Sequence, residues 1–245
     1  MSQRAPSQAR PFARAVEAAR FAMLSPLGIG VVTAATLIAA DIRRFADVGP
    51  GYGFLRWNLF LALVPLVLAY VVSWAARREL TRPALPVLAL AWIVFLPNAP
   101  YLVTDLVHLR EGFSIPNLIV LSLLALAGLL IGVKSVQLVQ RAVDNIWGEA
   151  AGWRAVQVIT VLIAFGVYLG RELRWNSWTI ILHPRELAHE TAQIALRSPS
   201  EPGQVSVGLL GIVVFAGSFY FAYRVLTGSG ARAARLTPAR GGSER

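Results

Sequence analysis

The stretch FLPNAPYLVTDLVHL (residues 95–109) decides the fold of this chain. It begins as apolar sequence, contains the prolines Pro97 and Pro100, and resumes with an aspartate and a histidine. A proline removes a backbone hydrogen-bond donor and interrupts a helix, so the stretch predicts a break in a hydrophobic helix. Because polar residues directly follow the break, we expect the function of the protein to depend on this region.

The overall composition indicates that this helix belongs to a membrane protein. The 245 residues are 56% hydrophobic and only 15% charged, which is well outside the usual range for soluble domains. Several apolar runs of about 20 residues have the length of membrane-spanning helices. The chain contains no cysteine, which excludes disulfides and cysteine-ligated metals.

We predict an all-α, polytopic transmembrane bundle of about six spans. Residues 1–23 are predicted to form a basic cytoplasmic segment, residues 24–226 the six-span domain, and residues 227–245 a disordered basic cytoplasmic tail. The long first apolar run favours an uncleaved span over a signal peptide. A short amphipathic helix at the membrane interface is predicted at residues 185–197.

The third span is predicted to cross the membrane as two half-helices. Residues 84–96 would extend only about 20 Å as an α-helix, which is shorter than the hydrocarbon core of the bilayer. Residues 101–109 must then complete the crossing, and the break between Pro97 and Pro100 lies inside the membrane. Backbone at this depth cannot face lipid, so we expect the break to be packed in protein or to line a polar cavity.

The residues around the break suggest how a site is built there. Asn98 is expected to cap the second half-helix by accepting hydrogen bonds from backbone donors that the break frees. In a continuing α-helix, Tyr101, Asp105 and His108 lie at positions i, i+4 and i+7 and therefore on one face. They would present a phenol, a carboxylate and an imidazole together. In the alternative interpretation the proline-kinked helix ends early, with Tyr101 in the aromatic belt and with Asp105 and His108 solvated outside the membrane.

The basic residues predict the orientation of the chain. The net charge of +10 comes from arginines beside the spans, which favours an orientation signal over a nucleic-acid surface. Most of the 23 basic residues fall on the side that carries both termini, so both termini are predicted to be cytoplasmic in an inner-membrane protein. Residues 56–58, Asp105, His108 and residues 171–178 then lie toward the outer face.

Three motifs resemble a bacterial family. These are residues 95–109, the sequence GRELRWNSW (residues 170–178) and the sequence RWNLF (residues 56–60). Together they are similar to the family known as domain of unknown function 1361, over roughly residues 50–225. The resemblance implies a multi-pass membrane protein and implies no activity.

We expect an outward-facing polar site that binds or transports an anionic small molecule or lipid headgroup. Arginine forks suit phosphate or carboxylate, and interfacial tryptophans suit an acyl portion; an arginine-tryptophan belt that anchors the fifth span is the structural alternative. The expected partners are the lipid bilayer and this ligand, with no nucleic acid and no cofactor. The candidate ligand-binding residues are Asn98, Tyr101, Asp105, His108, Arg171, Arg174, Trp175 and Arg56.

Three other functions are compatible with the sequence. A membrane hydrolase or transferase would use Asp105 to orient His108 as a general base. A divalent metal site would take the same pair together with Glu186 and His189. A structural or assembly role would use the GxxxG spacing of Gly128 and Gly132, either for packing within the chain or for a homo-oligomer.

Overall fold

The computed structural model describes residues 9–45, 53–78, 84–110, 113–172 and 202–228, and a few residues between 182 and 193. Apart from short turns, these five ranges are helical. Their elements are α1 (Ala9–Met23), α2 (Pro26–Phe45), α3 (Phe54–Arg77), α4 (Ala84–Phe95), α5 (Asn98–Tyr101), the 3₁₀ helix η1 (Leu102–Arg110), α6 (Ile115–Trp147), α7 (Glu149–Glu172) and α10 (Pro202–Thr227).

Six helical stretches in the described ranges are long and apolar enough to cross a membrane. The third of them runs from Ala84 to Arg110 and therefore includes α4, α5 and η1. Large apolar side chains also cover the outside of the bundle, among them Phe60, Val87 and Phe221. Such a surface suits contact with lipid chains. The structure confirms an all-α bundle, and the chain is a multi-pass membrane protein by the length and composition of these helices.

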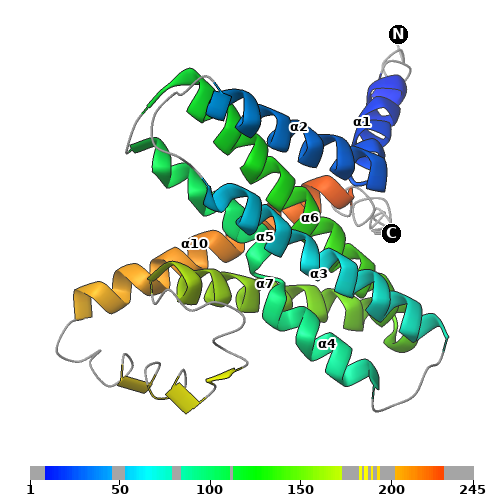
Figure 1. Ribbon diagram of the computed structural model, residues 1–245. Coiled ribbons are helices and arrows are strands. Elements are labelled where there is room, and N and C mark those ends of the chain that lie inside the picture. Colours follow the sequence, from blue (N-terminus) through cyan, green and yellow to red (C-terminus); the bar gives the residue numbers. More distant parts are fainter. Residues whose placement is uncertain are drawn as a thin grey trace, which may run out of the picture.

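Helix α6 is the centre of the bundle (Figure 1). It contacts α2, α3, α5, η1, α7 and α10. Its 33 residues extend about 50 Å, so the helix is longer than the hydrocarbon core and projects beyond it. Ser114 caps its start by accepting a hydrogen bond from the Asn117 backbone nitrogen at 3.3 Å, and Gly148 ends it with a positive φ of 85°.

The alternation of the six spans gives the bundle two ends, which can be followed in Figure 1. One end of the bundle, called here the α1 end, contains the first residues of α2 and α4 and the last residues of α3, α6 and α10. The opposite end, called the η1 end, contains the last residues of η1 and α7 and the first residues of α3 and α6. The η1 end is therefore the side that the sequence predicts to face outward.

A serine joins three helices inside the bundle. Ser135 of α6 is fully buried, and its hydroxyl donates to the Pro65 carbonyl oxygen of α3 at 2.9 Å. The same hydroxyl accepts a hydrogen bond from Trp92 Nε1 of α4 at 2.8 Å. Because Trp92 is also buried, this pair of bonds satisfies an indole N–H that water cannot reach.

Ser135→Ala is expected to lower the free energy of unfolding by about 1–3 kcal/mol, since it leaves the buried Trp92 N–H without its acceptor. Unfolding of the detergent-solubilised protein in increasing dodecyl sulfate, followed by tryptophan fluorescence, measures the loss. Ser122→Ala is the matched control, because Ser122 lies on the same helix with its side chain exposed. Equal stability of the two variants would show that the Trp92 bond contributes nothing.

Candidate functional site

The third span is interrupted by a change of helical winding. Helix α4 ends at Phe95, a turn follows at Leu96 and Pro97, and the short helix α5 leads into the nine-residue 3₁₀ helix η1. A 3₁₀ helix rises about 2.0 Å per residue, so η1 extends about 18 Å and completes the crossing that α4 leaves unfinished. The predicted break at Pro97 and Pro100 is confirmed.

Asn98 does not cap the second half-helix as the sequence predicted. The N-cap of α5 is Pro97, without a side-chain cap bond, and Asn98 is the first helical residue. Its Nδ2 donates to the Phe95 carbonyl oxygen at 2.9 Å and so satisfies the end of α4. The prediction is wrong because the backbone already binds the donors of α5: Ala99 N donates to Leu96 O, Tyr101 N donates to Pro97 O, and Pro100 has no N–H.

Two glycines of neighbouring helices enclose the break. A Cβ atom on Gly128 of α6 would lie 2.7 Å from the Leu102 Cβ and would also meet the Ala99 carbonyl oxygen. A Cβ atom on Gly166 of α7 would lie 2.8 Å from the Pro97 Cβ. The absence of a side chain at both positions lets α6 and α7 approach the irregular backbone closely. The break is packed in protein, as its depth in the membrane requires.

The second glycine of the GxxxG motif packs beside the first. A Cβ atom on Gly132 would lie 3.2 Å from Pro100 Cδ and 3.4 Å from Phe219 Cε2 of α10. Gly128 and Gly132 are both buried. The structure thus uses the motif for packing within the chain, and a homo-oligomer through these two glycines would have to open this packing.

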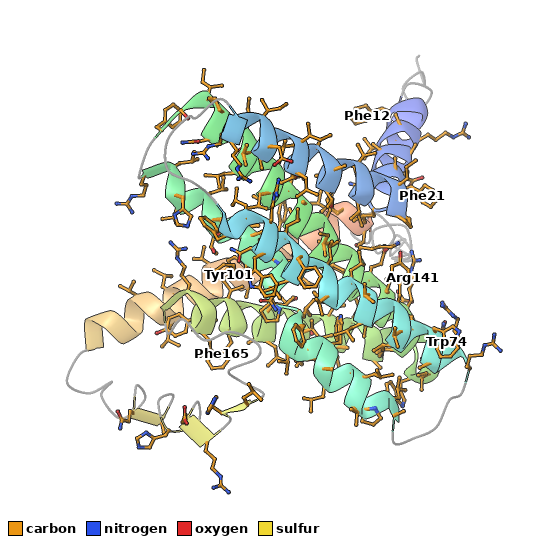
Figure 2. All side chains as sticks on the ribbon, in the orientation of Figure 1. Phe12, Phe21, Trp74, Tyr101, Arg141 and Phe165 are labelled. Carbon is orange, nitrogen blue, oxygen red and sulfur yellow. The ribbon has the colours of Figure 1, made fainter. Side chains whose placement is uncertain are left out.

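The 3₁₀ winding changes which side chains share a face. With three residues per turn, residues at i and i+3 are eclipsed, so Leu102, Asp105 and His108 form one row. Tyr101 belongs to the end of α5 and falls on a neighbouring row; Figure 2 labels it near the middle of the bundle. The predicted common face of Tyr101, Asp105 and His108 is therefore wrong, because it assumed α-helical winding.

Asp105 lies at the centre of the polar residues at the η1 end. Its side chain is 1% exposed, and its Oδ2 accepts a hydrogen bond from Asn58 Nδ2 of α3 at 3.3 Å. His108 and Arg171 both interact electrostatically with the Asp105 carboxylate. The ring of His108 also contacts Phe54, with 5.0 Å between the ring centroids. The structure joins Asp105 of η1 to Asn58 of α3 by a hydrogen bond, and it places His108 of η1 and Arg171 of α7 in the same region, with no ion pair between Arg171 and Asp105 among the described residues.

Arg56, a predicted ligand-binding residue, pairs with a residue outside the predicted site. Its guanidinium pairs with the carboxylate of Asp41 on α2, and both side chains are exposed. The residue of the RWN motif that reaches Asp105 is Asn58. The helical phase of α3 could have indicated this, because Asn58 lies on the same face as the buried Leu55 and Ala62.

A second polar contact at this end was not predicted. Arg43 of α2 is only 5% exposed, and its Nε donates a hydrogen bond to Asn117 Oδ1 at the start of α6. The buried positions Ile29 and Thr36 precede Arg43 at intervals of seven residues. This spacing, typical of one buried helix face, is the signal that places Arg43 inside and its neighbour Arg44 outside.

The four metal-ligand candidates are not assembled into one site. Glu186 Oε1 lies 3.2 Å from His183 Nδ1, and His189 Nε2 lies 3.5 Å from Gln193 Nε2. Among the residues that the structure describes, no group of three or more His, Asp or Glu side chains is placed to hold a metal ion. Arg174, Trp175, most of the predicted helix at residues 185–197 and the tail after residue 228 lie outside the described residues.

The sequence was compared with known proteins. The model of the family described as "Protein of unknown function (DUF1361)" matches residues 57–216. This range includes most of the three motifs on which the resemblance was based. No match was found among curated proteins or among solved structures.

Proposed function

This chain belongs to the DUF1361 family, and we propose that it binds an anionic group at the η1 end through Arg171, with Asp105 holding that arginine in place. The observation that carries the proposal is the burial of Asp105 within a membrane span. A charged side chain in this environment is costly and usually marks a binding site or an ion pathway. Its neighbours supply what a fixed carboxylate needs: an amide donor on Asn58 and the positive charge of Arg171.

Each residue has a distinct role in the proposed site. Asn58 fixes the carboxylate of Asp105 by a hydrogen bond, and the negative charge of the carboxylate attracts the guanidinium of Arg171 through space. The remaining guanidinium donors suit a phosphate or carboxylate group, which they bind in a fork geometry. His108 is half-buried beside Phe54 and lies in the same row of η1 as Asp105.

The depth of Arg171 favours a lipid headgroup as the anionic group. Arg171 is the last residue of the candidate span Glu149–Arg171, and the end of a span suits the layer where the hydrocarbon core meets the headgroups. A phosphate of a membrane lipid occupies the same layer. A free anion such as phosphate has the same chemistry, and the experiment below separates the two sources.

Binding at one end suits the structure better than an open transport path. In the middle of α6 the side chains of Leu130, Ile131 and Val133 are fully buried and apolar, and Ala99 beside them is buried as well. These residues lie between Asp105 and the next buried polar group of α6, Ser135. An enzymatic role of Asp105 and His108 stays a prediction.

The distribution of arginines supports a cytoplasmic α1 end. The exposed residues Arg77, Arg78, Arg141 and Arg154 all lie at that end of the bundle. Under the positive-inside rule, the η1 end then faces the outside of the inner membrane, and both termini are cytoplasmic.

Arg171→Gln is expected to weaken binding of phosphatidylglycerol by roughly 10–100-fold, the loss of one charge-assisted contact. Native mass spectrometry of detergent-extracted protein titrated with phosphatidylglycerol or phosphatidylcholine measures this change. Arg44→Gln is the control, because Arg44 is exposed at the same end. Phosphatidylglycerol binding by Arg171→Gln at the wild-type affinity would contradict a lipid site. In a parallel arm, thermal stabilisation by inorganic phosphate that Arg171→Gln abolishes would assign the site to a free anion.

Asp105→Asn tests whether the two residues act together. The amide keeps an acceptor for Asn58 and removes the charge that orients Arg171, so we expect weaker binding with little loss of folded protein. In the double variant Asp105→Asn/Arg171→Gln, binding should be no weaker than in Arg171→Gln alone, because one interaction is lost in both. Additive losses would show that the two residues act independently.

A further inference from the structure

Helix α1 projects to the side from the α1 end of the bundle (Figure 1). It packs against the start of α2 and turns away from it at a large angle (Figure 1). Since α2 is a candidate membrane span that begins at Pro26, a helix turned away at this point has a direction that suits the plane of the membrane surface. Its fifteen residues include three arginines and one glutamate, a composition that does not suit a span.

The turn between α1 and α2 is tightly fixed. The Ser25 hydroxyl donates to the Ala22 carbonyl oxygen at 2.7 Å and accepts from the Gly28 backbone nitrogen at 3.0 Å. A Cβ atom on Gly28 would meet the Ala22 carbonyl oxygen and would lie 3.0 Å from that of Met23. The ends of the two helices are therefore in backbone contact, and the direction of α1 is set by its junction with α2.

The two phenylalanines of α1 lie on opposite faces. Phe12 shares its face with Val16 and Met23, which follow at i+4 and i+11. Phe21 follows at i+9, half a turn away; Figure 2 shows Phe12 on the side of α1 nearer α2 and Phe21 on the other side. Phe12 is 74% exposed and Phe21 is 81% exposed, so no part of the described chain covers either ring.

We propose that α1 is an in-plane membrane helix that inserts its Phe12–Val16–Met23 face between anionic phospholipids at the α1 end. The apolar face supplies buried area in the interface, as in other surface-bound amphipathic helices. The positive charge of α1, which includes Arg14 and Arg20, complements an anionic leaflet. The exposed arginines Arg77 and Arg78 lie at the same end and add positive charge on the same side of the membrane. This proposal does not depend on the binding site at the η1 end.

Because the chain contains no cysteine, one introduced cysteine can be labelled selectively on either face of α1. Phe12→Cys and Phe21→Cys variants of the full chain, each carrying an environment-sensitive nitrobenzoxadiazole label, are reconstituted into vesicles. The vesicles contain phosphatidylcholine alone or with added phosphatidylglycerol, and part of the lipid is brominated in its acyl chains to quench nearby labels. Both sites are exposed, so the labels should not disturb folding.

In vesicles with phosphatidylglycerol, we expect the label at position 12 to shift to shorter wavelength and to be quenched at least about twofold more than the label at position 21. If only the Phe12 face is inserted, the label at position 12 lies among the acyl chains and the label at position 21 lies in water. Equal quenching at both positions, or a label at position 12 that stays in water, would overturn the proposal.

The charge contribution is tested with Arg14→Gln/Arg20→Gln in the position 12 variant. We expect the phosphatidylglycerol content needed for half-maximal quenching to rise, with about tenfold weaker apparent affinity for the anionic surface. Arg110→Gln is the control, because Arg110 is exposed at the η1 end. Quenching that is the same with and without phosphatidylglycerol would overturn the assignment of an anionic lipid partner.

Discussion

Gly128→Val is expected to lower the free energy of unfolding by about 3 kcal/mol or more. The new side chain would overlap the Ala99 carbonyl oxygen and the Leu102 Cβ, both of which belong to the irregular part of the third span. Neither atom is the end of a flexible side chain, so the strain cannot be relieved by a rotamer change. The variant should lose monodispersity after extraction and unfold at a lower dodecyl sulfate concentration.

The matched control for Gly128→Val is Gly217→Val. Gly217 also lies within a spanning helix, and a Cβ atom there would meet nothing within 4 Å. The two variants share the same change in helix propensity, so their difference isolates the packing against the break. We expect Gly217→Val to remain within about 0.5 kcal/mol of the wild type. If Gly128→Val were as stable as this control, the enclosure of the break would be unimportant for the fold.

Arg43→Ala is expected to destabilise the protein by about 2–4 kcal/mol. The substitution removes a buried side chain and leaves the Asn117 Oδ1 atom without the guanidinium that donates to it. Arg44→Ala is the neighbouring control, because the Arg44 side chain is exposed; it should change stability by no more than about 0.5 kcal/mol. Unfolding in dodecyl sulfate, followed by tryptophan fluorescence, compares the two.

A compensating pair distinguishes the lost hydrogen bond from the lost volume. Arg43→Met with Asn117→Leu replaces both polar partners by apolar side chains, which often restores stability at a buried polar pair. We expect this double variant to recover much of the loss caused by Arg43→Ala. Failure to recover, together with a small effect of Asn117→Leu alone, would indicate that Arg43 acts through other contacts.

The membrane fold was largely predictable because its determinants are local. Hydropathy and length give the six spans, and the prolines give the position of the break. The winding of η1 was not predictable from the same local signals. It is formed against α6, where Gly128 contacts Leu102, and this contact joins residues that are distant in the sequence.

The candidate site was only partly predictable for a related reason. Asp105, His108 and Arg171 stand out as polar residues at helix ends, and the structure places all three at the η1 end of the bundle. Choosing between Arg56 and Asn58 as the residue of α3 that reaches them requires the rotation of that helix. From the sequence, the charged Arg56 is the more obvious partner for a carboxylate than the amide of Asn58. The helical phase of α3 nevertheless favours Asn58.

The glycine-lined break has a consequence for the order in which the protein is made. Gly128 and Gly166 enclose the irregular part of the third span, and both follow it in the chain. During synthesis, α4, α5 and η1 must therefore enter the membrane before the helices that cover their irregular backbone exist. The third span can reach its final form only after α6 and α7 have been inserted. The packing that encloses the break is thus completed late in the synthesis of the chain.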